Sequence, residues 1–161
     1  VMLGSIAHCY TGEIDMTLGK KYFTDDASKV VLLKGAIIDR YTIRRKMSQG
    51  EIVYLDADKY LAGRSGRRTY NHAATRIVMQ GVTGINERVR LKATFARNVF
   101  CANSVNYLVL QTSEVDEMFV LAVLNSRLAN YVFKKFSTNS NVNGYEVDNL
   151  SFPREVPIES E

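Results

Sequence analysis

The chain has 161 residues, of which 46% are hydrophobic and 24% charged, as is typical of a single folded domain. It contains no apolar run of about eighteen residues, so the sequence predicts no membrane-spanning helix. Its two cysteines, Cys9 and Cys101, form no CxxC pair, which argues against a zinc knuckle or a disulfide framework. We therefore expect reduced thiols in the core of a cytoplasmic protein.

Positive charge is concentrated in the middle of the chain. The net charge is +4, but residues 34–97 contain fourteen lysines and arginines against five acidic residues, while the segments on both sides are slightly acidic. This segregation is expected of a protein that binds a polyanion, although a solvated basic face without a partner gives the same pattern. Charge alone therefore leaves nucleic-acid binding open.

Strand patterns separated by turn signals occupy the first half of the chain. The sequence predicts strands at 3–9, 29–38 and 51–55, and the second contains a continuous Val-Val-Leu-Leu run, as in strands buried on both faces. Residues 61–72 contain two glycines and three arginines, which predicts a basic loop without regular structure.

A group of cations follows the second of these strands directly. Arg40, Arg44, Arg45 and Lys46 come in quick succession, with Tyr41 among them. If the partner is DNA, the buried strand would be a rigid anchor that presents these cations to it, so that phosphate contacts fix the register before any base is read.

The segment RVRLKATFA, residues 88–96, alternates between polar and apolar residues. Its pattern predicts a strand with Arg88, Arg90 and Lys92 on one face. Such a face is consistent with DNA contact and also with charges that discourage aggregation. The sequence predicts further strands at 76–80, 98–101 and 106–110.

The last third of the chain begins with a helical pattern. Apolar residues at three- and four-residue steps predict a helix over Ser113–Phe136, with acidic residues in its first turn and Lys134 and Lys135 at its end. Asn125 and Ser126 interrupt the apolar stripe, which predicts a kink or hydrogen bonds to the sheet.

A final strand pattern ends at Pro153. Together these patterns predict an α+β fold, with a mixed, twisted sheet of about six strands and a long C-terminal helix packed on it. We expect residues 1–161 to form one domain.

The inventory of reactive side chains argues against catalysis by this chain alone. The two histidines, His8 and His72, are too few for a His-rich metal site, and we expect His8 to be a core residue. No carboxylate-rich nuclease motif, GxGxxG, Walker loop or Asn-Pro-Pro-Tyr methyltransferase motif occurs. We predict no catalytic residue, metal or cofactor in this chain.

Arginine and amide side chains instead provide the chemistry of base recognition. Arginine offers a bidentate fork to guanine or phosphate, and asparagine or glutamine does the same for adenine. The predicted DNA-binding residues are Arg40, Tyr41, Arg44, Arg45, Arg64, Arg67, Arg68, Tyr70, Gln80, Arg88, Arg90 and Lys92.

Four segments of the chain carry a resemblance to a known family. They are IAHCYTG, VLLKGAIIDRY, RIVMQGVTG, and FVLAVLNSRLANYVFKKFS followed by NGYEVDNLSFPREVPI. In this order they resemble the TaqI-like specificity domain at the C-terminal end of adenine-N6 DNA methyltransferases, including type IIG restriction-modification enzymes. Lys34, Gly35, Arg40 and Tyr41 match the second motif, and Asn125 and Ser126 match the helix, where we expect structural roles for Gly35 and Asn125.

The resemblance implies a target recognition domain that reads a short sequence in double-stranded DNA. A separate methyltransferase domain of the same polypeptide would flip and methylate the adenine, and S-adenosylmethionine would be bound by that parent enzyme, with or without endonuclease activity. Because the chain does not begin with Met, we expect a fragment of such an enzyme. An RNA-binding module and a protein-assembly domain stay open as alternatives.

Overall fold

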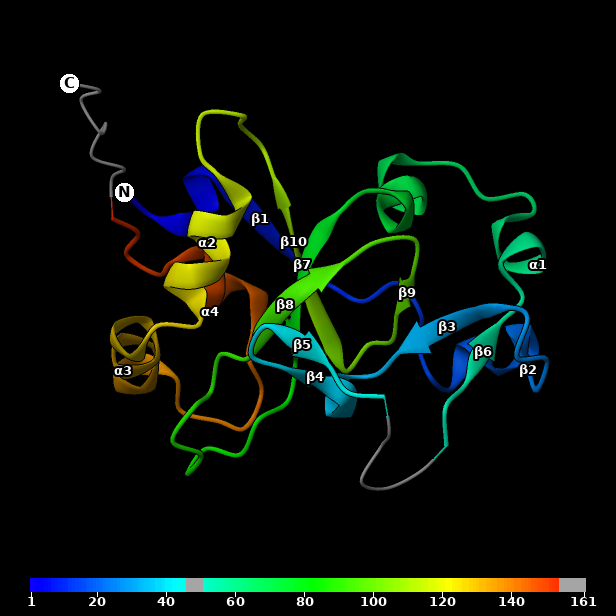
Figure 1. Cartoon of the computed structure of the whole chain (residues 1–161), viewed down its shortest axis with the longest axis horizontal. Coiled ribbons are helices and arrows are strands. Elements are labelled where there is room, and N and C mark those ends of the chain that lie inside the picture. Colours follow the sequence, from blue (N-terminus) through cyan, green and yellow to red (C-terminus); the bar gives the residue numbers. More distant parts are fainter. Residues whose placement is uncertain (46–50, 154–161) are drawn as a thin grey trace.

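The large lobe of the molecule is built on an antiparallel sheet (Figure 1). The computed structural model describes residues 1–45 and 51–153, which form two lobes side by side. In spatial order, the four strands of the large lobe are β1 (Ala7–Thr11), β10 (Val105–Leu110), β7 (Arg76–Gln80) and β8 (Ala93–Ala96). The hairpin of β4 (Ile38–Asp39) and β5 (Thr42–Ile43) packs against β7 and β8.

The small lobe contains a second sheet of four short strands. In spatial order these are β2 (Phe23–Thr24), β6 (Tyr54–Leu55), β3 (Val30–Leu33) and β9 (Phe100–Cys101). The β3 and β9 strands run parallel, whereas the other two pairs are antiparallel. The α+β fold class is therefore confirmed, but the expected single sheet of six strands is wrong.

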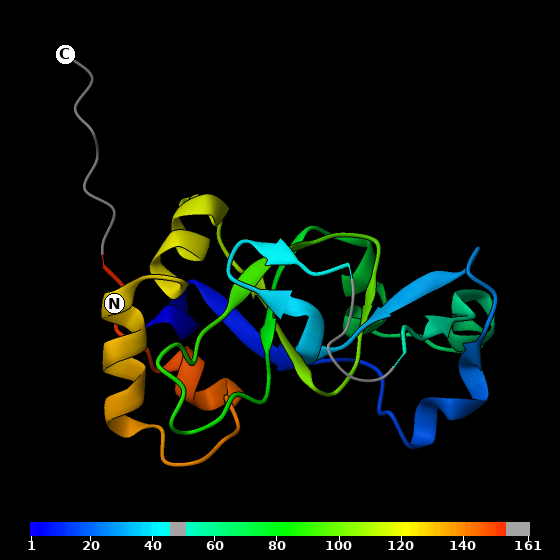
Figure 2. The ribbon, with the colours of Figure 1, turned by 60° about the horizontal axis from the view of Figure 1, so that its bottom comes forward.

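The described residues also contain four α-helices and four 3-10 helices. The α-helices are α1 (Ala57–Leu61), α2 (Glu117–Leu124), α3 (Arg127–Phe136) and α4 (Gly144–Asp148). The 3-10 helices are η1 (Leu3–Ser5), η2 (Leu18–Tyr22), η3 (Gly35–Ile37) and η4 (Arg67–Ala73). In both ribbon views α3 and α1 lie at opposite ends of the molecule (Figures 1 and 2). No helix in the described ranges is long and apolar enough to cross a membrane.

The expected long C-terminal helix is divided into α2 and α3. The Asn125 side chain accepts a hydrogen bond from the backbone N–H of Ala93 at 3.0 Å and donates one to its carbonyl at 2.9 Å. The amide thereby pairs with β8 as another strand would, and Ser126 starts a new helix by accepting from Ala129 N–H at 3.0 Å. The prediction of hydrogen bonds from Asn125 to the sheet is confirmed.

Hydrophobic packing occurs on both faces of the large sheet. One face packs against α2, α3 and α4, with Leu108 and Phe133 fully buried between them. The opposite face packs against η3 and β4, around Val78 and Tyr107. Separate packing around Phe100 stabilises the small lobe. Both Cys9 and Cys101 are buried free thiols, as expected, and burial raises the pKa of each to about 12.

A buried ion pair joins the two lobes. Arg76 on β7 pairs with Glu13, and the Arg76 guanidinium also donates to the Val99 carbonyl at 2.7 Å. Glu13 accepts a further hydrogen bond from the Cys101 N–H of β9 at 2.9 Å. Because these bonds connect strands of both sheets, they fix the small lobe against the large one.

Gly35 has the structural role expected of it. Its N–H donates to the Ser104 hydroxyl at 3.0 Å, and a Cβ at this position would lie 2.4 Å from the Ser104 carbonyl oxygen. The chain can therefore turn from β3 into η3 only where no side chain is present.

Several local predictions are wrong. The predicted strand at 29–38 is divided by η3, and the strand pattern before Pro153 is occupied by α4. His8 is not a core residue: its side chain is 43% exposed, and its Nδ1 lies 3.0 Å from a carboxylate oxygen of Asp148. Strands of two residues are too short to show a periodicity, which is why the pattern merged them with their neighbours.

Candidate nucleic-acid interface

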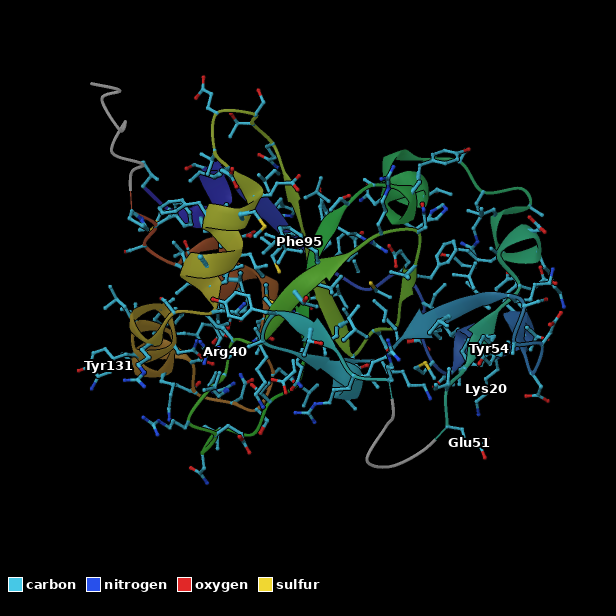
Figure 3. The ribbon with its side chains drawn as sticks, viewed as in Figure 1. Lys20, Arg40, Glu51, Tyr54, Phe95 and Tyr131 are labelled. Carbon is cyan, nitrogen blue, oxygen red and sulfur yellow. The ribbon has the colours of Figure 1, made fainter. Side chains whose placement is uncertain are left out.

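A basic cleft of approximately 680 Å³ lies between α3, the β4–β5 turn and the segment before β8. Five cations line it, and none of the described residues that line it is acidic. The cations are Arg40, Arg88, Arg127, Lys134 and Lys135. Figure 3 shows Arg40 between the hairpin and α3. The structure thus combines two predicted DNA-binding residues, Arg40 and Arg88, with three cations of α3.

The α3 cations lie on one side of the helix because of their spacing. Arg127, Tyr131, Lys134 and Lys135 are separated by four, three and one residues, which places them along one helix face. Tyr131 is 61% exposed, and Lys135 Nζ lies 4.8 Å from its ring centroid. The sequence analysis missed this face because it assigned the two lysines to the helix dipole; the spacing from Arg127 was the available signal.

The amides on the cleft floor are already engaged. The side-chain oxygen Oδ1 of Asn130 accepts hydrogen bonds from the backbone N–H groups of Arg90 and Leu91, both at 2.8 Å, and its Nδ2 donates to the Ser126 backbone carbonyl at 3.0 Å. Asn125 is bound to Ala93 in the same manner. Since the side-chain amides of Asn125 and Asn130 are hydrogen-bonded to the backbone, they do not provide a bidentate contact to a base. The cleft therefore presents mainly positive charge.

The β4–β5 turn positions Arg40. The Tyr41 N–H donates to the Ala93 carbonyl at 2.8 Å, which ties the turn to β8. Tyr41 itself has φ 63°, a left-handed conformation uncommon for residues other than glycine, and its side chain is 55% exposed. The Arg40 guanidinium lies 5.8 Å from the Tyr41 ring centroid, at the rim of the cleft.

The charge of Arg44 is balanced within the same hairpin. Its guanidinium pairs with Asp39, whose other oxygen accepts from the Arg40 N–H at 2.8 Å. Burial raises the pKa of Asp39, but the Arg44 guanidinium and the Arg40 N–H outweigh this effect and hold the pKa below its ordinary value. Arg45 is exposed next to this pair, and Lys46 lies outside the described residues.

The prediction of one exposed face for Arg88, Arg90 and Lys92 is wrong. Residues 88–92 precede β8 and are not a strand. Arg88 is exposed, whereas Arg90 is completely buried and Lys92 is partly buried, 4.0 Å from Glu87. The Asn130 amide binds the backbone here in place of a neighbouring strand, so the alternation of faces is lost.

Arg90 has a structural role inside the large lobe. Its Nε donates to the Thr83 hydroxyl at 2.8 Å, and its Nη2 donates to the carbonyl oxygens of Asn139 and Asn141 at 2.7 and 3.3 Å. Arg90 therefore holds the loop after α3 and is not available at the surface.

Gln80 is also engaged within the protein. Its amide donates to the Ile38 carbonyl at 2.6 Å, which links β7 to β4. This bond uses one N–H of the carboxamide and does not involve its oxygen, so contact of Gln80 with a base stays a prediction.

The predicted basic loop lies on the small lobe, away from the cleft. It contains the end of α1 and, from Arg67, η4, so the expectation of no regular structure is wrong. Arg64 and Tyr70 are both exposed there, with Tyr70 63% exposed, while the side chains of Arg67 and Arg68 are not described. The predicted residues whose side chains the structure describes therefore do not form one continuous band.

The comparison with known families identifies the chain. Residues 30–151 match the TaqI-like C-terminal specificity domain. The chain belongs to this family, and the matched residues extend from β3 through α4, so they include the basic cleft and Arg64. No curated protein matches the chain significantly.

Proposed function

We propose that the chain is the target recognition domain of an adenine-specific DNA methyltransferase or restriction-modification enzyme, and that it binds double-stranded DNA. The observation that carries this proposal is the basic cleft, in which five cations surround a concave surface and no described lining residue is acidic. Membership of a family of specificity domains supports it, because such a domain has to locate a target.

The chemistry of the cleft suits the DNA backbone. Duplex DNA carries about one negative charge per 1.7 Å of axis, and lysines and arginines that contact phosphates release its counterions. Phosphate contacts orient a protein on DNA without reading the sequence. We infer that the cleft holds the backbone and that bases are read by residues elsewhere on the surface.

Methylation would be performed by another part of the same enzyme. In this proposal a methyltransferase domain of the same polypeptide binds S-adenosylmethionine and the flipped adenine. The role of this chain is to place the duplex so that the target adenine reaches that domain.

Equilibrium binding of fluorescent duplexes at several salt concentrations tests the proposal. If about five phosphates are contacted, log K should fall with log salt at a slope of roughly −4 to −5. Binding without salt dependence would contradict the role of the cleft. Competition with single-stranded RNA tests the RNA-binding alternative, which predicts that RNA displaces duplex DNA and stacks on exposed tyrosines.

A further inference from the structure

The surface next to α1 contains one arginine whose guanidinium is held in a fixed position. The Arg64 guanidinium lies 4.3 Å from the ring centroid of Tyr60 and 5.7 Å from that of Tyr22. Its Nε donates to the Tyr60 carbonyl at 2.8 Å, and its Nη2 donates to the Tyr22 hydroxyl at 3.3 Å. We call these three residues the Arg64 cluster.

The two tyrosines are themselves fixed by the core of the small lobe. Tyr60 is 9% exposed and makes edge-to-face contacts with Tyr22 at 5.3 Å and with Phe100 at 5.4 Å. The hydrogen bond from Arg64 lowers the pKa of Tyr22 and raises that of Arg64. An exposed guanidinium is thus anchored to a packed aromatic group.

Arg64 keeps enough donors to recognise a ligand. A guanidinium has five N–H groups, and the bonds to Tyr60 and Tyr22 use one on Nε and one on Nη2. Both N–H groups of Nη1 and one of Nη2 remain, and bidentate contact with guanine O6 and N7 needs two donors on neighbouring nitrogens.

The surroundings of Arg64 leave room for a base to approach. Gly63 and Gly66 flank it with φ +72° and +136°, and a Cβ on Gly63 would meet nothing within 4 Å. The orientation of the fork matters for a base edge and little for a phosphate, which accepts hydrogen bonds from many directions. The cleft supplies charge without such fixed forks, so the two surfaces suit different parts of the DNA.

We propose that Arg64 is a specificity-determining residue that reads a guanine in the target sequence, and that Tyr60 and Tyr22 are its positioning residues. This assignment rests on the proposed function. A guanidinium that is already held in the binding orientation loses less side-chain entropy on binding than a mobile one does. It should therefore discriminate more strongly between the correct base and the others.

Selection from a randomised duplex library by the full chain, followed by sequencing, tests this assignment. We expect the wild-type chain to enrich a motif that contains guanine. Arg64→Lys keeps the charge and loses the fork, so preference for one guanine position should fall roughly tenfold, because a bidentate pair discriminates bases by about 5- to 150-fold. Binding to unselected duplex should change by less than about threefold.

Two further variants separate base reading from a structural role. Tyr22→Phe keeps the aromatic packing and removes the hydroxyl, so it should weaken preference at the same guanine position by a smaller factor. Arg97→Lys makes the same exchange at another exposed arginine and should leave the motif unchanged. Thermal denaturation of each variant should match the wild type.

The outcomes distinguish this assignment from the proposed function. A motif that Arg64→Lys leaves intact, or an equal loss of affinity for every sequence, overturns the assignment while duplex recognition stands. A wild-type chain that binds duplexes and enriches no motif overturns sequence-specific recognition and the assignment together. Failure of the wild-type chain to bind duplexes at all overturns both as well.

Discussion

The basic cleft and the Arg64 cluster present positive charge in different ways. The cleft brings five cations from three segments to one concave surface, above amides that are bonded to the backbone. The Arg64 cluster presents one guanidinium whose plane is fixed by two tyrosines. A high density of positive charge favours binding to any duplex, whereas a guanidinium in a fixed position favours one base over another. We therefore expect mutations in the cleft to change mainly affinity, and mutations in the Arg64 cluster to change mainly sequence preference.

The largest effect is expected for the buried arginine that supports the cleft. Arg90→Met keeps much of the side-chain volume but leaves the Thr83 hydroxyl and the Asn139 carbonyl without their donor. We expect a loss of about 3 kcal/mol in the free energy of unfolding, measured by urea denaturation. Arg88→Met is the matched control: Arg88 is exposed, so stability should change by less than about 0.5 kcal/mol while duplex affinity falls. Equal stability of the two variants would contradict the buried role of Arg90.

The second effect concerns affinity through the cleft. Lys134→Gln with Lys135→Gln removes two of its five cations, so duplex affinity at low salt should fall roughly ten- to fiftyfold and the salt slope should become shallower by about 2. Selection from the duplex library should return the wild-type motif. The control is Lys20→Gln with Lys29→Gln, which changes the net charge equally on the small lobe, where Figure 3 shows Lys20 far from Arg40. A control variant as weak as the cleft variant would contradict a main role of the cleft in affinity.

A smaller gain in affinity is expected when Arg44 is released. Asp39→Asn removes the carboxylate that pairs with Arg44, close to Arg40 at the cleft rim. Duplex affinity should rise by about two- to fivefold, because one more uncompensated cation becomes available. Asp25→Asn makes the same charge change at an exposed position on the small lobe and serves as the control. A motif altered by Asp39→Asn would indicate that the hairpin reads bases, so that the cleft rim and the Arg64 cluster would both determine specificity.

Local sequence pattern predicted some features of the fold and the cleft, but not those that depend on contacts between distant segments. The β7 strand was predicted with its observed bounds, and the bond from Asn125 to the sheet was anticipated, because both depend on local pattern and on the need to satisfy a buried amide. The burial of Arg90 could not be predicted, since two of its three acceptors come from a loop about fifty residues later in the chain. Two of the five cleft cations, Arg40 and Arg88, were predicted to bind DNA because they lie in the basic part of the sequence. The three α3 cations were not, because they lie next to these arginines only in the folded chain.

The smallest effect tests the geometry of the Arg64 cluster directly. Because Arg64 donates to the Tyr22 hydroxyl and stabilises its phenolate, the pKa of Tyr22 lies below its ordinary value, whereas burial raises the pKa of Tyr60. In an alkaline titration followed by tyrosinate absorbance, one tyrosine should therefore ionise early. Tyr22→Phe should remove this early step, and Arg64→Met should shift it toward the ordinary range near about 10, because Arg64 lowers this pKa more than Lys21 does. Since deprotonated Tyr22 is favoured in the folded state, its contribution to stability appears as the pH rises through its lowered pKa and is absent below it. An early step that Arg64→Met leaves at the same pH would show that the guanidinium is not held against Tyr22, and the fixed fork on which base reading depends would be lost with it.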